Sequence, residues 1–123
     1  MNTYLFTVPI APGKTETFLK YVKEMTGPRN EEFKRSRQRA GLTSEQVFLQ
    51  KTPQGDFCVV MLAGDNPQKS LETMLKSNDP FDTWFREKVV IDAHGLDLSQ
   101  PMPDNQRILD YSGTPTREKV GTR

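Results

Sequence analysis

The residues from Asp79 to Leu98 constrain the fold more than any other stretch of this chain. They contain its only tryptophan and its only histidine, Trp84 and His94. Asp79 can cap a helix, the proline after it suits the first helical position, and Gly95 can end the helix in a left-handed conformation. We therefore predict one helix over residues 80–94. Its apolar residues recur at helical spacing, so one face must lie against a sheet: Phe81, Trp84, Phe85 and Val89.

Charge and cysteine content restrict the partners that we expect. With 17 basic and 16 acidic side chains the net charge is +1, so no overall field attracts nucleic acid or an anionic membrane. A single cysteine, Cys58, excludes a disulfide within the chain and is typical of a reducing compartment. No apolar run is long enough to cross a membrane, and the first residues lack the pattern of a signal peptide. We expect a cytoplasmic protein without nucleic-acid or membrane partners.

The first third of the chain predicts a strand followed by an interrupted helix. Residues 3–8 alternate between two faces with a period of two, which is typical of a strand. Helical spacing of apolar residues begins near Lys14. Pro28, which lacks an amide proton, should break that helix before it resumes and continues to Ala40. Gly41 is suited to end it.

The resumed helix is rich in arginine and lysine, spread round its circumference. This pattern is typical of a solvated face, and a phosphate or carboxylate site is the alternative. We expect Glu31 to pair with Arg35, four residues later. Arg37 differs, because its spacing from the apolar positions puts it nearest the inward face. A buried arginine needs a carboxylate partner, and the candidates are Glu45 and Asp65.

Two apolar runs, residues 46–51 and 57–62, flank a turn that contains Pro53 and Gly55. They should pair as an antiparallel hairpin. The second run is apolar on both faces, which is typical of a central strand. Cys58 lies in it and is interpreted as a small core residue. Asn66 should cap a further helix that ends near residue 77.

The predicted order of elements is β, α, β, β, α, β, with residues 108–111 as a short last strand. This is the α+β, ferredoxin-like arrangement, a four-stranded antiparallel sheet with its helices on one face. We predict one domain over residues 1–112 and a flexible tail over 113–123, which has too few apolar residues to offset its ordering entropy. Because the central strand is apolar on both faces, a second copy should cover the other face, giving a homodimer.

Several segments resemble known families. Residues 70–77, followed by Phe-Asp-Thr-Trp-Phe at 81–85, are similar to the second-helix region of the dimeric α+β barrel superfamily, which includes the antibiotic biosynthesis monooxygenases. More closely, four segments resemble motifs of a small bacterial family of uncharacterised function within that superfamily: residues 36–47, 55–57, 79–86 and 94–98. The resemblance covers Tyr4 to Leu98 and implies a dimeric barrel. It does not imply a chemistry, because fold does not determine function.

Haem-degrading monooxygenases of that superfamily have a tryptophan and a haem-ligating histidine at the separation of Trp84 and His94. The surrounding sequence disagrees, because matching the preceding helix puts Met74 in the place of the tryptophan and leaves His94 beyond the site. The strand-one asparagine of that family also has no match. One histidine, one cysteine and dispersed carboxylates give no metal-ligand spacing either. We therefore expect neither cofactor nor metal.

His94 has two interpretations. The dipole at a helix C-terminus would favour its imidazolium and raise its pKa, so that it acts as a cap paired with Asp92 or Asp97. Alternatively, it is a polar group at the mouth of a pocket, where it could bind a ligand or transfer a proton. Trp84 is either core or pocket wall. The remaining candidates for ligand binding are Arg37, Glu45, Arg86 and Tyr4.

Three functions follow from these residues. The first is a homodimer that binds a small ligand in a cavity between helices and sheet. The second is a cofactor-independent enzyme, monooxygenase-like or isomerase-like, in which His94, Arg86 or Glu45 transfers a proton. The third is a structural or interaction module without chemistry. An enclosed cavity lined by His94 or Arg37 would favour the first two functions, and a filled core would favour the third.

Overall fold

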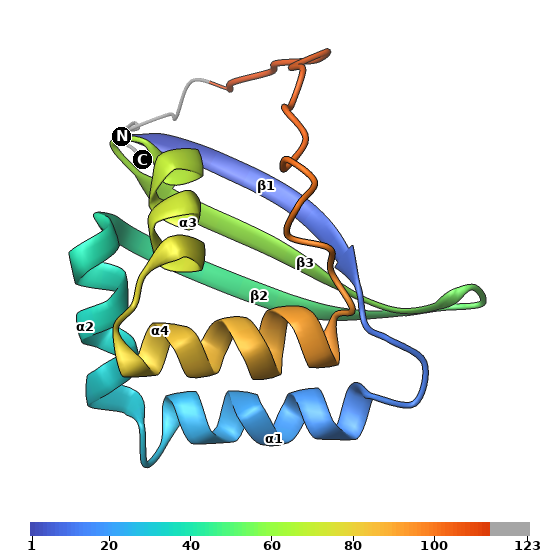
Figure 1. Ribbon diagram of the computed structural model, residues 1–123. Coiled ribbons are helices and arrows are strands. Elements are labelled where there is room, and N and C mark those ends of the chain that lie inside the picture. Colours follow the sequence, from blue (N-terminus) through green and yellow to red (C-terminus); the bar gives the residue numbers. More distant parts are fainter. Residues whose placement is uncertain (114–123) are drawn as a thin grey trace.

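Three strands form one antiparallel sheet in the order β1-β3-β2 in the computed structural model, which describes residues 1–113 (Figure 1). They are β1 (Asn2–Pro9), β2 (Leu42–Thr52) and β3 (Gly55–Gly64). The chain is thus α+β, and β3 is the central strand that its two apolar faces predicted. The predicted hairpin is confirmed. Its strands are longer than predicted, because backbone pairing continues past the apolar runs to Thr52 and Gly55 at the turn.

The helices lie on one side of this sheet (Figure 1). They are α1 (Thr15–Thr26), α2 (Asn30–Ala40), α3 (Pro67–Lys76), α4 (Pro80–Trp84) and the π-helix η1 (Phe85–Ala93). The predicted break at Gly27-Pro28 separates α1 from α2, which run in different directions. η1 continues α4 and lies beside α1, so these two long segments form the edge of the helical layer.

The helix ends follow the capping signals of the sequence. The carboxylate of Asp79 accepts a hydrogen bond from the backbone N–H of Phe81 (3.0 Å), and the side chain of Asn66 accepts one from Lys69 (3.2 Å). Gly41 ends α2 in the left-handed region with φ of 87°, which L-residues with a Cβ rarely adopt. These local contacts fix where the elements begin and end.

The helix predicted over residues 80–94 has a different inner geometry from the one expected. From Phe85 onward its backbone has the wider turns of a π-helix, and the N–H of His94 donates to the carbonyl of Val89, five residues earlier (3.1 Å). The predicted apolar face still turns inward, because Phe81 and Val89 are buried and Trp84 and Phe85 pack against the core, but the α-helical spacing is wrong beyond residue 84. Trp84 and Phe85 are only half-buried, whereas the buried residues of η1 are Val89, Val90 and Ala93.

The predicted last strand over residues 108–111 does not form. These residues have no regular structure, and the side chains of Ile108 and Leu109 are 88% and 85% exposed. Within residues 1–113 the sheet therefore has three strands, not the four predicted. Side chains that pack against so little gain too little burial to offset the entropy of ordering residues 108–111 as a strand. The predicted tail falls, from residue 114, outside the described residues.

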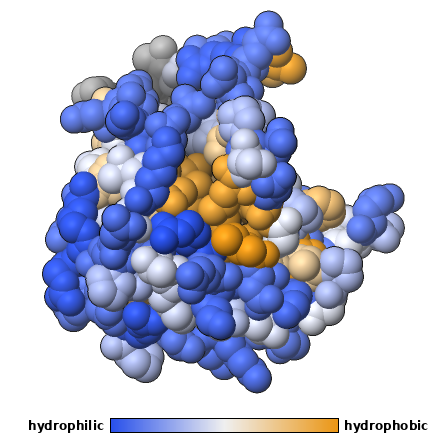
Figure 2. Space-filling model, in the orientation of Figure 1, coloured by the Kyte–Doolittle hydropathy of each residue, from blue (hydrophilic) through white to orange (hydrophobic). Residues whose placement is uncertain are grey.

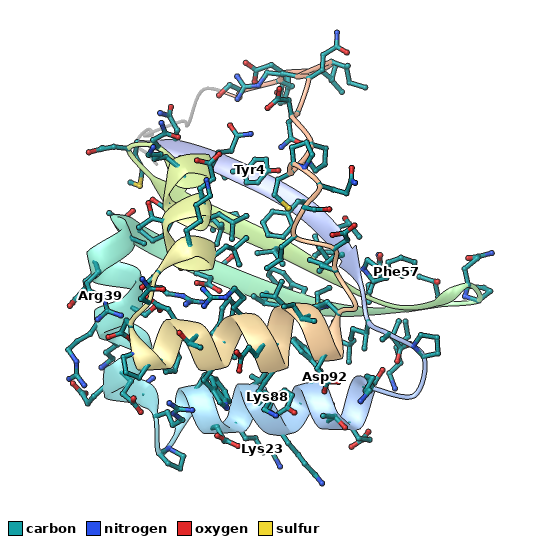
Figure 3. All side chains as sticks on the ribbon, viewed as in Figure 1. Tyr4, Lys23, Arg39, Phe57, Lys88 and Asp92 are labelled. Atoms are coloured by element: carbon teal, nitrogen blue, oxygen red, sulfur yellow. The ribbon has the colours of Figure 1, made fainter. Side chains whose placement is uncertain are left out.

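Side-chain hydrogen bonds hold the segment 96–105 against β1 in place of a strand. The hydroxyl of Tyr4 donates to the carbonyl oxygen of Pro103 (2.6 Å), and the side-chain amide of Asn105 donates to that of Leu5 (2.8 Å). Figure 3 shows Tyr4 beside this segment. Because single side-chain bonds replace a continuous backbone ladder, the segment follows β1 without extending the sheet.

The two faces of the sheet differ in burial. The inner face, toward the helices, carries core residues such as Cys58, which is fully buried and whose burial raises its pKa to about 11. This confirms Cys58 as a core residue. The opposite face, called the outer face below, has the side chains of Leu5 and Phe48 50% and 58% exposed. Half-buried neighbours from β3 complete this apolar surface: Phe57, Val59 and Met61.

Candidate functional site

A cavity of about 320 Å³ lies between the inner face of the sheet and the helices. Figure 2 shows apolar side chains gathered in a hollow at the centre of the face that carries the helices. Strands β1 and β3 supply one wall through Phe6, Val8, Val60 and Leu62. Helices supply most of the rest, including Phe18, Val22, Met25, Leu71, Met74, Phe85 and Val89. The wall is therefore mainly apolar.

Four polar side chains interrupt this apolar wall: Thr26, Arg37, Glu45 and His94. The hydroxyl of Thr26 is occupied as a donor, because it lies 3.0 Å from the carbonyl oxygen of Val22 one turn earlier. Arg37 and Glu45 come from α2 and β2, and His94 follows the last residue of η1. Residues distant in sequence thus meet at one cavity.

Arg37 and Glu45 form a two-pronged ion pair at the cavity. Nε of Arg37 lies 2.7 Å from Oε1 of Glu45, and one terminal nitrogen lies 3.4 Å from Oε2. The rings of Phe33 and Phe85 have centroids 4.5 and 4.4 Å from the guanidinium carbon. Glu45 is thus confirmed as the partner of the inward Arg37, and Asp65 is not. The pair brings no net charge into the cavity.

A hydrogen-bond network with Ser36 and Asp82 also holds Arg37 in place. Its second terminal nitrogen donates to the hydroxyl of Ser36 (3.1 Å), and that hydroxyl donates to the buried carboxylate of Asp82 on α4. Burial alone would raise the pKa of Asp82, but hydrogen bonds from Ser36, Ser77 and Arg39 outweigh it and lower that pKa. The network fastens α2 to α4 and fixes the position of the guanidinium.

The remaining charges of α2 lie at the surface. Glu31 pairs with Lys34, at 3.9 Å, and not with Arg35 as predicted. Residues three and four positions apart are both neighbours on a helix, so Lys34 and Arg35 are both within reach of Glu31.

His94 is held by the end of β1. Its Nδ1 lies 2.8 Å from the carbonyl oxygen of Pro9, and its ring packs against that of Phe18 with centroids 5.0 Å apart. Because a carbonyl oxygen only accepts, Nδ1 must carry the proton. The side chain is 8% exposed, and this burial lowers the pKa of His94, although the bond to Pro9 opposes the shift.

His94 occupies the C-cap position of η1 as predicted, but the predicted capping by its charged imidazole is wrong in two respects. Burial moves its pKa in the opposite direction from the helix dipole, and its ring bonds to a strand instead of to the helix end. Asp92, a predicted partner, pairs with Lys14 at 3.2 Å, and Asp97 accepts from Ser99. With Nδ1 protonated and the ring neutral, Nε2 keeps a lone pair, and no donor within residues 1–113 reaches it.

The other predicted ligand-binding residues lie away from the cavity. Trp84 packs against the ring of Tyr21 and carries the guanidinium of Arg29 4.3 Å above its ring. Arg86 donates to the carbonyl oxygens of residues 75 and 77 (both 2.9 Å) and so closes the end of α3. Tyr4 bonds to the segment after η1. The cavity therefore unites only His94, Arg37 and Glu45 of the six candidates.

Two wall residues come from a segment that the sequence indicated only as a connection. Leu96 and Met102 line the cavity and also a wider hollow of about 940 Å³ between β1, α3 and residues 96–105. The available signal was a single large apolar residue, Met102, between two prolines. Its side chain had no predicted element to bury it, so sequence periodicity could not place it.

Comparisons with protein-family models, with curated proteins and with solved structures each find no match to this chain. The resemblance to the dimeric α+β barrel superfamily thus stays a prediction beyond the α+β fold itself. Among residues 1–113, no group of three or more histidine, cysteine or carboxylate side chains could hold a metal ion, and none of their helices combines the length and apolarity of a membrane span. Of the features described, the cavity bears most directly on function.

Proposed function

We propose that the protein is a homodimer that binds one small, mainly apolar molecule per chain in the cavity between helices and sheet. The observation that carries this proposal is the cavity itself, whose volume of about 320 Å³ lies within the range of small-molecule sites. Apolar side chains that line a hollow instead of packing against one another stabilise a fold less than a filled core does. A core that served packing alone would gain by filling it, so the cavity supports ligand binding over a purely structural module.

The outer face of the sheet supports the dimer. Leu5 and Phe48 are half or more exposed there, opposite Met61 and Val59 of the central strand. A contiguous apolar surface on a sheet is typical of an interface. We propose that two copies pack through this face as in a dimeric α+β barrel. Each chain would then have the ferredoxin-like order β, α, β, β, α, with α1 and α2 counted as one interrupted helix. We also place this dimer in the cytoplasm.

Native mass spectrometry of the freshly purified protein tests the proposal. We expect a species of twice 14.1 kDa that carries a small mass on each chain and releases it on denaturation. Val89→Phe, which fills the cavity, should abolish this mass. Ile91→Phe is the matched control, because that neighbour in η1 is 46% exposed and off the lining. Protein that carries no mass, and that takes up neither 1-octanol nor an ether of equal size, would refute ligand binding.

His94 supports catalysis as a second candidate function. A neutral imidazole with a lone pair beside an apolar cavity is suited to act as a general base. Arg86 has no part in this candidate, since it bonds to the end of α3. The molecule identified by mass spectrometry should then be converted over time by the wild-type protein to a product that differs in mass or in NMR spectrum, and it should persist with His94→Gln. Persistence with both proteins would leave binding alone as the function.

A further inference from the structure

The acceptor on His94 sets a chemical requirement on whatever occupies the cavity. The ring is more than nine-tenths buried, and its Nδ1 is committed to the carbonyl oxygen of Pro9 at 2.8 Å. Nε2, at the other side of the ring, finds no donor among residues 1–113. A buried polar atom without a partner costs free energy. An occupant that donates a hydrogen bond to Nε2 removes this cost, whereas one without a donor leaves it in place.

The charged residues of the lining discriminate against ions. Arg37 is the one cation among the described lining residues, and Glu45 neutralises it through two contacts of 2.7 and 3.4 Å. The aromatic rings of Phe33 and Phe85 lie beside its guanidinium. A carboxylate or phosphate would bring a charge into an apolar space whose only cation is already paired. Such a charge is costly to bury.

The hydroxyl oxygen of Thr26 and the carboxylate of Glu45 are the other side-chain acceptors on the lining, and both compete less well for a donor. Thr26 is exposed, so water can satisfy its oxygen. Both oxygens of Glu45 already accept from Arg37, which satisfies part of their capacity. Nε2 of His94 accepts from no described residue. The gain from a new hydrogen bond is therefore greater at His94.

From these contacts we infer that the cavity selects uncharged, mainly apolar molecules that donate one hydrogen bond, through a hydroxyl or an N–H group, to Nε2 of His94. This inference rests on the proposed function and narrows it to a ligand class. The apolar wall supplies affinity and the acceptor on His94 supplies orientation.

Three probes of similar size separate the effect of a hydrogen-bond donor from that of a charge. They are 1-octanol, which donates, its isomer methyl heptyl ether, which only accepts, and octanoate, which is an anion at pH 7.5. Calorimetric titration should give octanol about three- to tenfold tighter binding than the ether, as one hydrogen bond warrants, and octanoate the weakest. Equal affinities for alcohol and ether, or tighter binding of octanoate, would overturn the inference and leave the proposed function standing. Failure of all three probes to bind would overturn the inference, and in protein that also carries no mass after purification it would refute the proposed function as well.

Variants assign the preference to His94. His94→Phe should remove the alcohol-over-ether preference, and His94→Gln, whose amide can both donate to Pro9 and accept from a ligand, should restore most of it. Thr26→Val is the matched control, because it removes another polar group of the lining, a hydroxyl that donates to the carbonyl oxygen of Val22. A preference that survives His94→Phe would contradict the assignment.

The wild-type protein provides a readout that does not depend on a variant folding. His94 is the only histidine, so its two ring nitrogens give the only imidazole ¹⁵N signals of the chain. Saturation with 1-octanol should move the Nε2 signal toward that of a hydrogen-bonded nitrogen and leave Nδ1 nearly unchanged. The ether should move neither. Equal shifts with both probes would show that the alcohol hydroxyl does not reach Nε2.

Discussion

Nδ1 of His94 and the carbonyl oxygen of Pro9 lie 2.8 Å apart and join the end of η1 to the end of β1. A backbone bond from the N–H of Ala11 to the carbonyl of Ala93 (2.8 Å) reinforces the same junction. Together they bring the histidine to the cavity and determine which ring nitrogen keeps a lone pair. The chemistry of the cavity therefore depends on a contact between two chain segments that are far apart in the sequence.

The first prediction is that His94 makes the protein less stable in acid. Its folded pKa lies below the ordinary 6.5, so the unfolded chain takes up the proton at a higher pH than the folded chain does. The stability contribution is therefore complete above pH 6.5 and is lost as the pH falls from 6.5 to the folded pKa. Urea unfolding of wild type and His94→Gln between pH 5 and 8 should show a smaller loss on acidification in the variant. A larger loss in the variant would contradict the buried neutral imidazole.

The second prediction concerns the pair of Arg37 and Glu45. Arg37→Met leaves the carboxylate of Glu45, only 15% exposed, without its cation. We expect a decrease of roughly 3–5 kcal/mol in the free energy of unfolding, measured with urea. Lys34→Met is the control, since its pair with Glu31 is exposed and spans 3.9 Å, and it should change stability by less than about 0.5 kcal/mol. Similar losses in both variants would show that the buried pair contributes no more to the free energy of unfolding than the exposed pair does.

Local signals in the sequence predicted the parts of the fold that local contacts fix. Asp79 and Asn66 cap helices as expected, and the central position of β3 followed from its two apolar faces. The π-helical turns of η1 were not predictable in this way, because the same residues are compatible with an α-helix. The state of His94 was not predictable either, since it depends on Pro9, which is remote in sequence.

The cavity residues that the sequence predicted correctly are also those that local signals indicate. Arg37 was assigned an inward position from helical spacing, and its need for a carboxylate led to Glu45. Trp84 was proposed as core or pocket wall, and it packs against the core through Phe81 and Tyr21 but lies outside the cavity lining. Met102 was missed because nothing in a proline-rich connection indicates burial.

The third prediction tests the dimer. Light scattering coupled to size exclusion should give a mass of twice 14.1 kDa at micromolar concentration. Phe48→Lys places a charge in the apolar outer face and should yield a monomer. Ile108→Lys changes an equally apolar residue that is 88% exposed but off the sheet, and it should remain dimeric. A monomeric wild-type protein would contradict the proposed interface.

The fourth prediction is that Cys58 is unreactive in the folded protein. Burial raises its pKa to about 11 and no part of the side chain is exposed, so almost no thiolate is accessible at pH 8. A disulfide reagent should label it only as fast as the chain unfolds, and denaturant should make labelling immediate. Rapid labelling of the native protein would indicate that the inner face of the sheet opens readily.

The last prediction separates the segment 101–113 from the residues beyond it. The segment supplies Met102 to the cavity wall and contributes the bonds from Tyr4 to Pro103 and from Asn105 to Leu5. Residues 114–123 contain one apolar side chain, that of Val120, and sequence composition gives them little with which to dock. Deleting 114–123 should therefore leave the melting temperature within a degree or two. Deleting 101–123 should lower it by several degrees and weaken binding of 1-octanol, because the cavity loses part of its wall. Equal melting temperatures for the two truncated chains would show that the segment adds no stability, and unchanged octanol binding would show that Met102 is not needed to close the cavity.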